Sequence, residues 1–378
     1  MNNLKTKLLE RLSYIDNLRI FLIIMVISHH AAQPYGPTGG DWPLFNEVRN
    51  AIFGPFFFIN ASFGMGLFFL VSGYFVPQSF KKKGATLFIK SKLIRLGIPL
   101  VFMTLFLFAP LSYQSSNSDI PFLKYFFSKY IGDWQLEFGH MWFVFHLLVY
   151  SFGYATIMIL IHKLNLSGIR IDKVQRHFPI IVFIMILAFV TWIVRIWYPI
   201  DKWVKFFWTM PVEVAHLPQY VSLFAIGIFA GKNNWFSKIP SKLGFTWLII
   251  GLFTSIAYAV SYLTEFRESI SMAINNHYIN LFFYCIWESF ICIALCIGII
   301  TLFRERINIS TNLLSVLAQN TYTVYIIHII IVVSIQFSIA EATLSPITKF
   351  GIVVFISVPI CFGLSYLIRK IPGIRRVL

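Results

Sequence analysis

The sequence predicts an all-α protein that crosses a membrane about ten times. Of its 378 residues, 58% are apolar and only 12% are charged, whereas soluble domains carry about a quarter charged residues. Apolar runs of about twenty residues, the length that spans ~30 Å of hydrocarbon, recur along the whole chain. The lysines and arginines are concentrated in the short connections between these runs. Together these observations exclude a water-soluble fold.

Ten apolar runs are expected to form the spans. They are longer and more continuously apolar than the alternating strands of about ten residues that build a membrane β-barrel. Helices that satisfy their own backbone hydrogen bonds are therefore predicted. The expected spans are residues 16–33, 53–77, 87–113, 139–162, 178–199, 214–231, 243–264, 277–302, 316–338 and 349–368. Because no internal repeat or linker is found, residues 1–378 are expected to form a single membrane domain without an extra soluble domain.

Positive charge predicts the orientation of these spans. If the N-terminus is cytoplasmic, connections on the cytoplasmic side hold 22 of the 31 lysines and arginines, and those on the opposite side hold 8. Such an excess is typical of the cytoplasmic side, so both termini are expected in the cytoplasm and the protein in the inner (cytoplasmic) membrane. The net charge of +16 would suggest a nucleic-acid partner in a soluble protein. Here the orientation explains it, and no nucleic acid is expected.

The outer connections and the cysteines predict little chemistry of their own. Connections 34–52, 114–138 and 200–213 are long enough to form a partial lid. We interpret their tryptophans as anchors in the membrane–water interface, with sugar stacking as the alternative; these are Trp42, Trp134, Trp203 and Trp208. The four cysteines lie inside apolar runs without CxxC spacing. They are expected to be buried free thiols, and no metal site is predicted.

Two ionisable residues in the first span form the main candidate site. Arg19 and His30 are eleven residues apart, which on an α-helix is three turns plus about 20°, or ~16 Å along the axis. Both side chains are therefore predicted to share one face and one cavity. Histidine suits general-base chemistry near neutral pH, and an intramembrane cation suits an anionic ligand. The alternative is an arginine that reaches the interface and a histidine bonded to a neighbouring helix.

Several further segments, taken in order, resemble the acyltransferase-3 family of integral-membrane acyltransferases. Arg19 and His30 resemble its arginine, ten residues, then histidine signature, with the approach Ile15-Asp16-Asn17-Leu18-Arg19. The other matching segments are Phe68-Phe69-Leu70-Val71-Ser72-Gly73-Tyr74, Lys92-Leu93-Ile94-Arg95-Leu96-Gly97-Ile98-Pro99, His140-Met141-Trp142-Phe143-Val144, Leu217-Pro218-Gln219-Tyr220 with Phe224 and Gly227, and Asn320-Thr321-Tyr322-Thr323-Val324-Tyr325-Ile326-Ile327-His328. These matches cover residues 11–330, nearly the whole chain.

The resemblance implies a membrane-bound O-acyltransferase, which transfers groups other than amino-acyl groups. The implied donor is acyl-CoA, usually acetyl-CoA, and the implied acceptor is a hydroxyl of a cell-surface or lipid-linked carbohydrate, as in sugar O-acetyl and succinyl transferases. His30 would be the general base, although spacing alone does not separate it from His29. Arg19 would bind the donor or stabilise charge on the thioester oxygen.

The remaining candidates are assigned to the donor or to the acceptor. Arg95, Lys92 and Ser72 are placed with acyl-CoA, together with the cluster Lys81–Lys83, for which plain positive-inside orientation is the alternative. Ser72 and Gly73 also predict close helix contact. An acceptor or supporting role is assigned to Glu288, Tyr325, His328, Trp142, His140 and His29. For Glu288 a structural ion pair, and for His328 a packing role, are equally open. Glu213 and His216 are weaker acceptor candidates, and His146, His162, His177 and His277 are assigned no role.

Two other classes of function compete with this interpretation. A transporter or flippase of polysaccharide or lipid-linked glycan would also have about ten helices with intramembrane charges. Transporters often contain paired repeats with broken helices, and no such pairing is found. A membrane O-acyltransferase of another architecture, with its histidine late in the chain, is indicated by His328 alone. Beyond membrane lipid, acyl-CoA and carbohydrate, the sequence predicts no partner, and it does not fix an oligomeric state.

Overall fold

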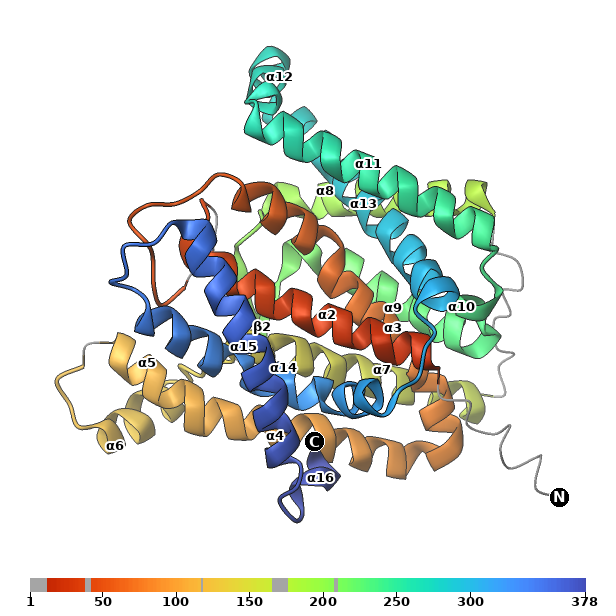
Figure 1. Cartoon of the computed structure of the whole chain (residues 1–378). Helices are drawn as coiled ribbons and strands as arrows, with labels where there is room; N and C mark the ends of the chain where they lie inside the picture. Colours follow the sequence, from red (N-terminus) through yellow and green to blue (C-terminus); the bar gives the residue numbers. More distant parts are fainter. Residues whose placement is uncertain (1–11, 38–41, 117, 165–175, 207–209) are drawn as a thin grey trace.

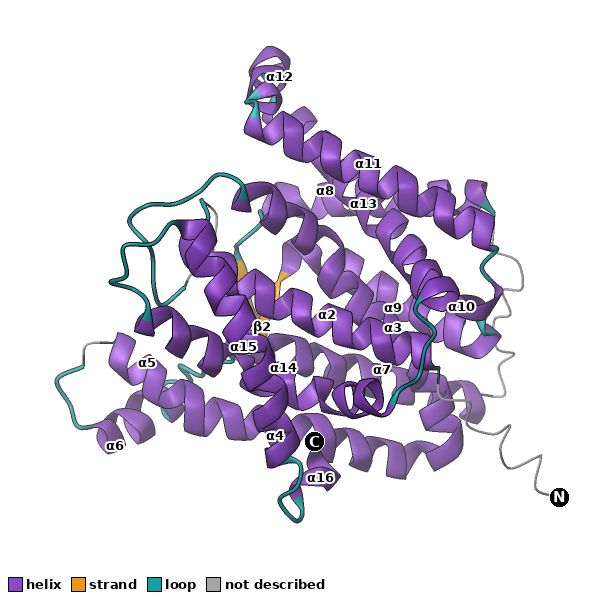
Figure 2. Ribbon diagram, viewed as in Figure 1, coloured by secondary structure: helices purple, strands orange, loops and turns teal. Residues whose placement is uncertain are grey.

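The computed structural model describes residues 12–37, 42–116, 118–164, 176–206 and 210–378, and these residues are almost entirely helical (Figures 1 and 2). The longer helices are α2 (Ser13–Ala32), α3 (Phe53–Lys92), α7 (Trp142–Lys163), α8 (His177–Trp197), α9 (Leu217–Asn233), α11 (Ser241–Leu263), α13 (His277–Arg306), α14 (Asn312–Ser338) and α15 (Pro346–Ile368). Short helices α4 (Ile98–Phe102), α5 (Ala109–Ser115), α6 (Phe122–Tyr125), α10 (Trp235–Lys238), α12 (Phe266–Ile274) and α16 (Ile374–Val377) lie between or after them. The prediction of an all-α membrane fold is confirmed.

Nine continuous helical stretches among the described residues are long and apolar enough to cross a membrane. One of them, Phe53–Tyr113, is 61 residues long and would measure ~90 Å if straight. Its backbone leaves the helical conformation at Gly84, where φ is +70° and ψ is 170°, and Figure 1 shows the chain turning back between the first part of α3 and α4. The expected spans 53–77 and 87–113 therefore correspond to the two arms of this stretch.

Large apolar side chains cover the outer surface of the helices. Phe355, Phe178 and Phe253 are 83%, 76% and 72% exposed, and all three lie within membrane-length helices. A soluble protein rarely exposes so much apolar surface, whereas lipid tails solvate it without cost. The outer surface thus supports the membrane assignment independently of hydropathy along the chain.

α2 lies near the centre of the bundle and positions the first-span residues. It contacts α3, α13, α14 and α15, and Figure 1 shows it crossing the middle of the molecule beside α14. α3 also packs closely against α9, because a Cβ on Gly73 would lie 2.3 Å from the backbone oxygen of Phe224, and one on Gly227 would lie 2.2 Å from that of Leu70. The predicted close contact at Gly73 is confirmed.

The long connections on the side of His30 carry the only strands among the described residues. Strands β1 (Trp203–Phe206) and β2 (Met210–Glu213) form an antiparallel hairpin in which Trp203 pairs with Glu213, drawn in orange in Figure 2. Loop 42–52 is fastened to the bundle, since the buried Lys349 ammonium donates to the Oδ1 of Asn46 at 3.0 Å. Trp208, expected at the interface, lies outside the described residues.

Candidate active site

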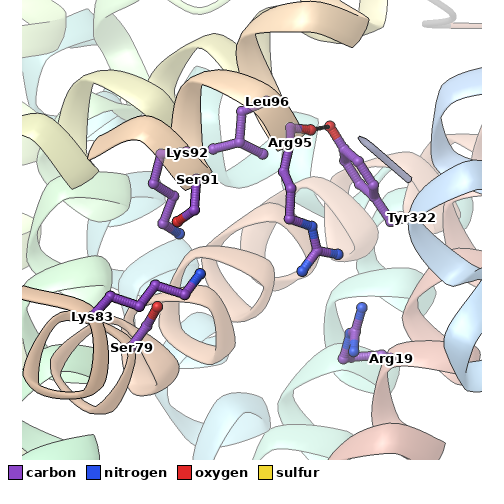
Figure 3. A pocket seen from close by; sticks show the side chains of 8 residues that line it. All are labelled: Arg19, Ser79, Lys83, Ser91, Lys92, Arg95, Leu96 and Tyr322. Atoms are coloured by element: carbon purple, nitrogen blue, oxygen red, sulfur yellow. Dashed lines mark hydrogen bonds between the residues drawn. The ribbon is translucent and has the colours of Figure 1, made fainter. Parts of the chain in front are cut away.

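A basic pocket of about 180 Å³ opens at the end of the bundle where α2 and α14 begin. Its lining is rich in cations and hydroxyls, and comprises Arg19, Ser79, Lys83, Ser91, Lys92, Arg95, Leu96 and Tyr322. Figure 3 shows the charged ends of Arg19, Arg95 and Lys83 pointing into the space between α2, α3 and the third span. Arg19 also has Asp16 at 3.7 Å. The three predicted cations Arg19, Lys92 and Arg95 are thus brought together.

A π-helical segment positions Arg95. Residues Leu93–Gly97 form η3, a π-helix that continues α3; such segments disturb the regular hydrogen-bond ladder and are frequent at functional sites. The Tyr322 hydroxyl, from α14, donates to the backbone oxygen of Arg95 at 2.6 Å, as the dashed line in Figure 3 shows. Tyr322 therefore ties the third span to α14 at the level where Arg95 enters the pocket. Sequence analysis included Tyr322 in a segment that resembles the family but gave it no role.

Three histidines from different helices gather at the other end of α2. The His30 ring is 5.2 Å from that of His328, and the His328 ring is 4.9 Å from that of His140, measured between centroids. His30 is in the last turn of α2, His328 is on α14 and His140 is in η6 (Gly139–Met141), directly before α7. The Tyr325 hydroxyl donates to the backbone oxygen of His140. We call His30, His140 and His328 the histidine cluster.

Hydrogen bonds to carbonyl oxygens fix which nitrogen of each ring carries the proton. Nδ1 of His30 donates to the side-chain oxygen of Gln33 at 2.5 Å, and Nδ1 of His328 donates to the Tyr325 carbonyl at 2.6 Å. Nε2 of His140 donates to the Ile326 carbonyl at 3.1 Å. Carbonyl oxygens only accept, so each neutral ring keeps its lone pair on the other nitrogen. The cluster therefore offers acceptor nitrogens and suits a ligand that donates, such as a hydroxyl.

Two of these acceptor nitrogens are buried and unused by the protein. No described residue forms a hydrogen bond with Nε2 of His328 or with Nδ1 of His140, and His328 is fully buried. A buried polar atom without a partner carries a free-energy cost of about 1–3 kcal/mol. Other buried side chains among the described residues also have an atom without a partner, but here two such nitrogens belong to rings that are 4.9 Å apart, and a ligand, a water or a catalytic role would explain them. The arrangement thus marks the cluster as a candidate for binding, beyond mere packing.

Trp42 covers the His30 ring, which corrects its expected role as an interfacial anchor. The indole is only 8% exposed and stacks on the imidazole, with 5.2 Å between centroids and 11° between planes. Its Nε1 donates to Oε1 of Gln336 at 2.9 Å, and Nε2 of Gln336 donates to the backbone oxygen of His30 at 2.9 Å. Trp42, the first residue of loop 42–52, therefore covers the His30 side of the histidine cluster. Trp134 and Trp203, by contrast, are 59% and 46% exposed, as interfacial residues would be.

His29 has different surroundings. Its ring lies 5.1 Å from Phe57 and 6.3 Å from Phe56, both on α3, whereas His30 faces α14. The structure thus separates two neighbours that spacing alone left equivalent, and it brings only His30 into contact with the other cluster histidines.

The basic pocket and the histidine cluster share one pair of helices. α2 carries Arg19 and His30, and α14 carries Tyr322 and His328. Arg19 lines the basic pocket together with Tyr322 of α14, and the His30 ring packs against His328 of α14. Both residues therefore lie toward α14, as expected if they share a face of α2. The pocket around Arg19 does not reach His30, since Ile23 and Ile27, one and two turns beyond Arg19, are buried. A cavity common to both residues was expected, and this pocket is not one.

Glu288 belongs to a separate buried ionic network. Its Oε2 lies 2.7 Å from Nη2 of Arg195, and its Oε1 lies 3.3 Å from Nε2 of His216. Nδ1 of His216 also contacts Glu213 at 2.9 Å. Arg195 is buried in the last turn of α8. Of the two alternatives for Glu288, the structure favours the structural ion pair.

Ser72 and Trp142 lie apart from both sites. Ser72 does not line the basic pocket, whose hydroxyls come from Ser79 and Ser91, so its assignment to the donor is not supported by its position. Trp142 follows the cluster residue His140 but stacks on Tyr220 of α9 at 5.6 Å, and its ring is 5.7 Å from Trp203 on the hairpin. Trp142 therefore packs against the hairpin and is not part of the histidine cluster.

His146, to which sequence analysis gave no role, anchors the same hairpin. It is 1% exposed, its Nε2 donates to the Pro211 carbonyl at 3.3 Å, and its Nδ1 accepts from the Tyr150 hydroxyl at 3.2 Å. Its position four residues into a membrane helix was the available signal, because an intramembrane histidine is unusual. Both ring nitrogens are occupied, so the residue is structural.

Comparison with known proteins decides the family. A family model described as an acyltransferase domain matches residues 12–366, which include the basic pocket and the histidine cluster. The chain belongs to the acyltransferase-3 family. It is therefore a multi-pass membrane acyltransferase. No curated protein and no solved structure matches the chain.

Proposed function

We propose that this acyltransferase moves an acyl group, in the simplest case acetyl, from acyl-CoA to a hydroxyl of a cell-surface or lipid-linked carbohydrate. The observation that carries the proposal is the pairing of a cation-lined pocket at one end of α2 with a histidine cluster at the other. The cation-lined pocket suits an anionic donor, and the histidine cluster suits an acceptor that carries a hydroxyl. The protein would lie in the cytoplasmic membrane with both termini in the cytoplasm, so the basic pocket would face the compartment that contains CoA.

His30 is the proposed general base. With its Nδ1–H held by Gln33, its Nε2 takes the proton of the acceptor hydroxyl while the hydroxyl oxygen attacks the thioester carbonyl carbon. The carbon–sulfur bond then breaks, and Nε2 returns the proton to the leaving thiolate. General-base catalysis of this kind typically contributes 10²–10⁴-fold. Lone pairs of His328 and His140 would accept hydrogen bonds from the acceptor and orient it.

Arg19 and Arg95 bind the donor in this proposal. Arginine forms strong charge-assisted hydrogen bonds with phosphate, and both guanidinium groups line the basic pocket. The flexible pantetheine arm would extend from that pocket along α2 and α14 to the histidine cluster. Because Ile23 and Ile27 fill part of this route, donor binding would require these side chains to move.

The test is thiol release from acetyl-CoA by the purified protein in lipid vesicles, with and without a polysaccharide acceptor. We expect His30→Ala to lower the rate by at least about 100-fold while expression and thermal stability stay unchanged. His29→Ala is the matched control and should retain most activity, because that ring packs between phenylalanines. Equal activity of His30→Ala and wild type would remove His30 from the mechanism. Transport of the glycan across the vesicle membrane without consumption of acetyl-CoA would instead favour a transporter.

A further inference from the structure

The polar side chains of the basic pocket form two groups. One group, on α2, η3 and α14, consists of Arg19, Arg95 and Tyr322. The other lies on both sides of the Gly84 break in α3 and consists of Ser79, Lys83, Ser91 and Lys92. In Figure 3 the ammonium groups of the second group point toward each other and toward the two serine hydroxyls, apart from the guanidinium groups of the first.

The break at Gly84 builds the second group. Ser79 and Lys83 are four residues apart, so they share a face of the first arm of α3. Ser91 and Lys92 belong to the second arm, which turns back at Gly84, where φ is +70°. The two arms thus present two ammoniums and two hydroxyls to one space. Of the lysines in the cluster Lys81–Lys83, only Lys83 lines the pocket.

We infer that the basic pocket contains two phosphate subsites, and that the Lys83–Lys92 group recognises the 3′-phosphate of coenzyme A. This inference rests on the proposed use of acyl-CoA. In CoA the diphosphate stands between the pantetheine arm and the nucleotide, whose ribose carries the 3′-phosphate. The arm must run along α2 and α14 toward His30, so the diphosphate lies at Arg19 and Arg95. The 3′-phosphate then falls on the far side of the pocket, at Lys83 and Lys92.

The size of the pocket agrees with this assignment. Its volume of about 180 Å³ is below the ~300–1,000 Å³ of pockets that enclose whole ligands. It is therefore suited to the phosphate groups, while the adenine remains outside. The consequence is donor selection: a carrier protein with a phosphopantetheine arm has a single phosphodiester and would leave the Lys83–Lys92 group unused. The protein is thus selective for free CoA thioesters.

The experiment compares acetyl-CoA with acetyl-3′-dephospho-CoA in vesicles of phosphatidylcholine, which supply no anionic headgroup to the pocket. Wild type should prefer acetyl-CoA by about tenfold in kcat/KM, mainly through KM. Lys83→Ala should reduce that preference severalfold, with kcat unchanged. Lys82→Ala is the matched control, because Lys82 is exposed but does not line the pocket. Arg95→Ala should weaken the binding of both donors to the same extent.

The outcomes separate this inference from the proposed function. Equal use of the two donors by wild type, or an equal loss with both donors in Lys83→Ala, overturns the 3′-phosphate subsite while acyl transfer from CoA stands. Acetyl transfer from neither donor overturns the proposed function itself. A tenfold preference that Lys83→Ala reduces and Lys82→Ala retains supports the inference.

Discussion

The buried ion pair between Arg195 and Glu288 predicts a large loss of stability when one partner alone is removed. The two side chains are 0% and 4% exposed, with 2.7 Å between Nη2 and Oε2. Replacing Arg195 by Met leaves the Glu288 carboxylate buried, with His216 still at 3.3 Å. Breaking a buried pair in this way typically destabilises a protein by about 3–5 kcal/mol. The Arg195→Met variant should therefore unfold at a temperature well below the unfolding temperature of the wild type.

A double-mutant cycle in one detergent, followed by thermal unfolding, measures this coupling. The variants are Arg195→Met, Glu288→Met and the double replacement, and the double variant should recover much of the loss because two apolar side chains then face each other. Each folded variant should retain its acyl-transfer activity, because the Glu288 carboxylate interacts with Arg195 and His216 and has a structural role. If Glu288→Gln instead abolished transfer at an unchanged unfolding temperature, Glu288 would belong to the active site and the structural interpretation would be wrong.

Three further predictions concern the two sites and the hairpin. Tyr322→Phe removes the donor to the Arg95 carbonyl and should raise KM for acetyl-CoA about three- to tenfold; a fall in kcat alone would contradict this. Trp42→Leu removes the indole that covers the imidazole of His30, the proposed general base, and should lower kcat about tenfold. An unchanged kcat would refute a positioning role for Trp42. Burial raises the pKa of Glu213, but its hydrogen bond with His216 outweighs this and holds the pKa below 4.5. This carboxylate therefore stabilises the hairpin above pH 4.5, and the benefit is lost as the pH falls through the lower pKa of the folded state. Hydrogen exchange of the hairpin amides should rise at that acidic pH in wild type and show no such rise in Glu213→Gln.

Local patterns in the sequence predicted the helices and part of the site. Helical periodicity put Arg19 and His30 on one face of the first span. In the structure Arg19 lines a pocket with Tyr322 of α14, and His30 packs against His328 of α14. Apolar run length located the spans to within a few residues, because burial in lipid fixes the length of a helix. A boundary between two spans was predicted in residues 78–86, and the backbone does leave the helical conformation there, at Gly84.

Contacts between distant segments were not predictable from one sequence. Trp42 was interpreted as an interfacial residue because it lies in an outer loop, yet its position is set by Gln336, which is 294 residues away. Glu288 has no basic neighbour along the chain, and its partner Arg195 comes from another helix. Periodicity describes one helix at a time. It carries no information on which side chains of other helices will meet it.

An experimental structure of the full chain with a non-hydrolysable acetyl-CoA analogue would test the proposed mechanism most directly. We expect phosphates at Arg19 and Arg95, the pantetheine arm between α2 and α14, and the acyl carbonyl close to Nε2 of His30. The space between carbonyl carbon and imidazole should hold one acceptor hydroxyl, whose oxygen would lie ~3–3.5 Å from the carbon. An analogue bound with its acyl group away from the histidine cluster, or with its phosphates outside the basic pocket, would contradict the proposed mechanism.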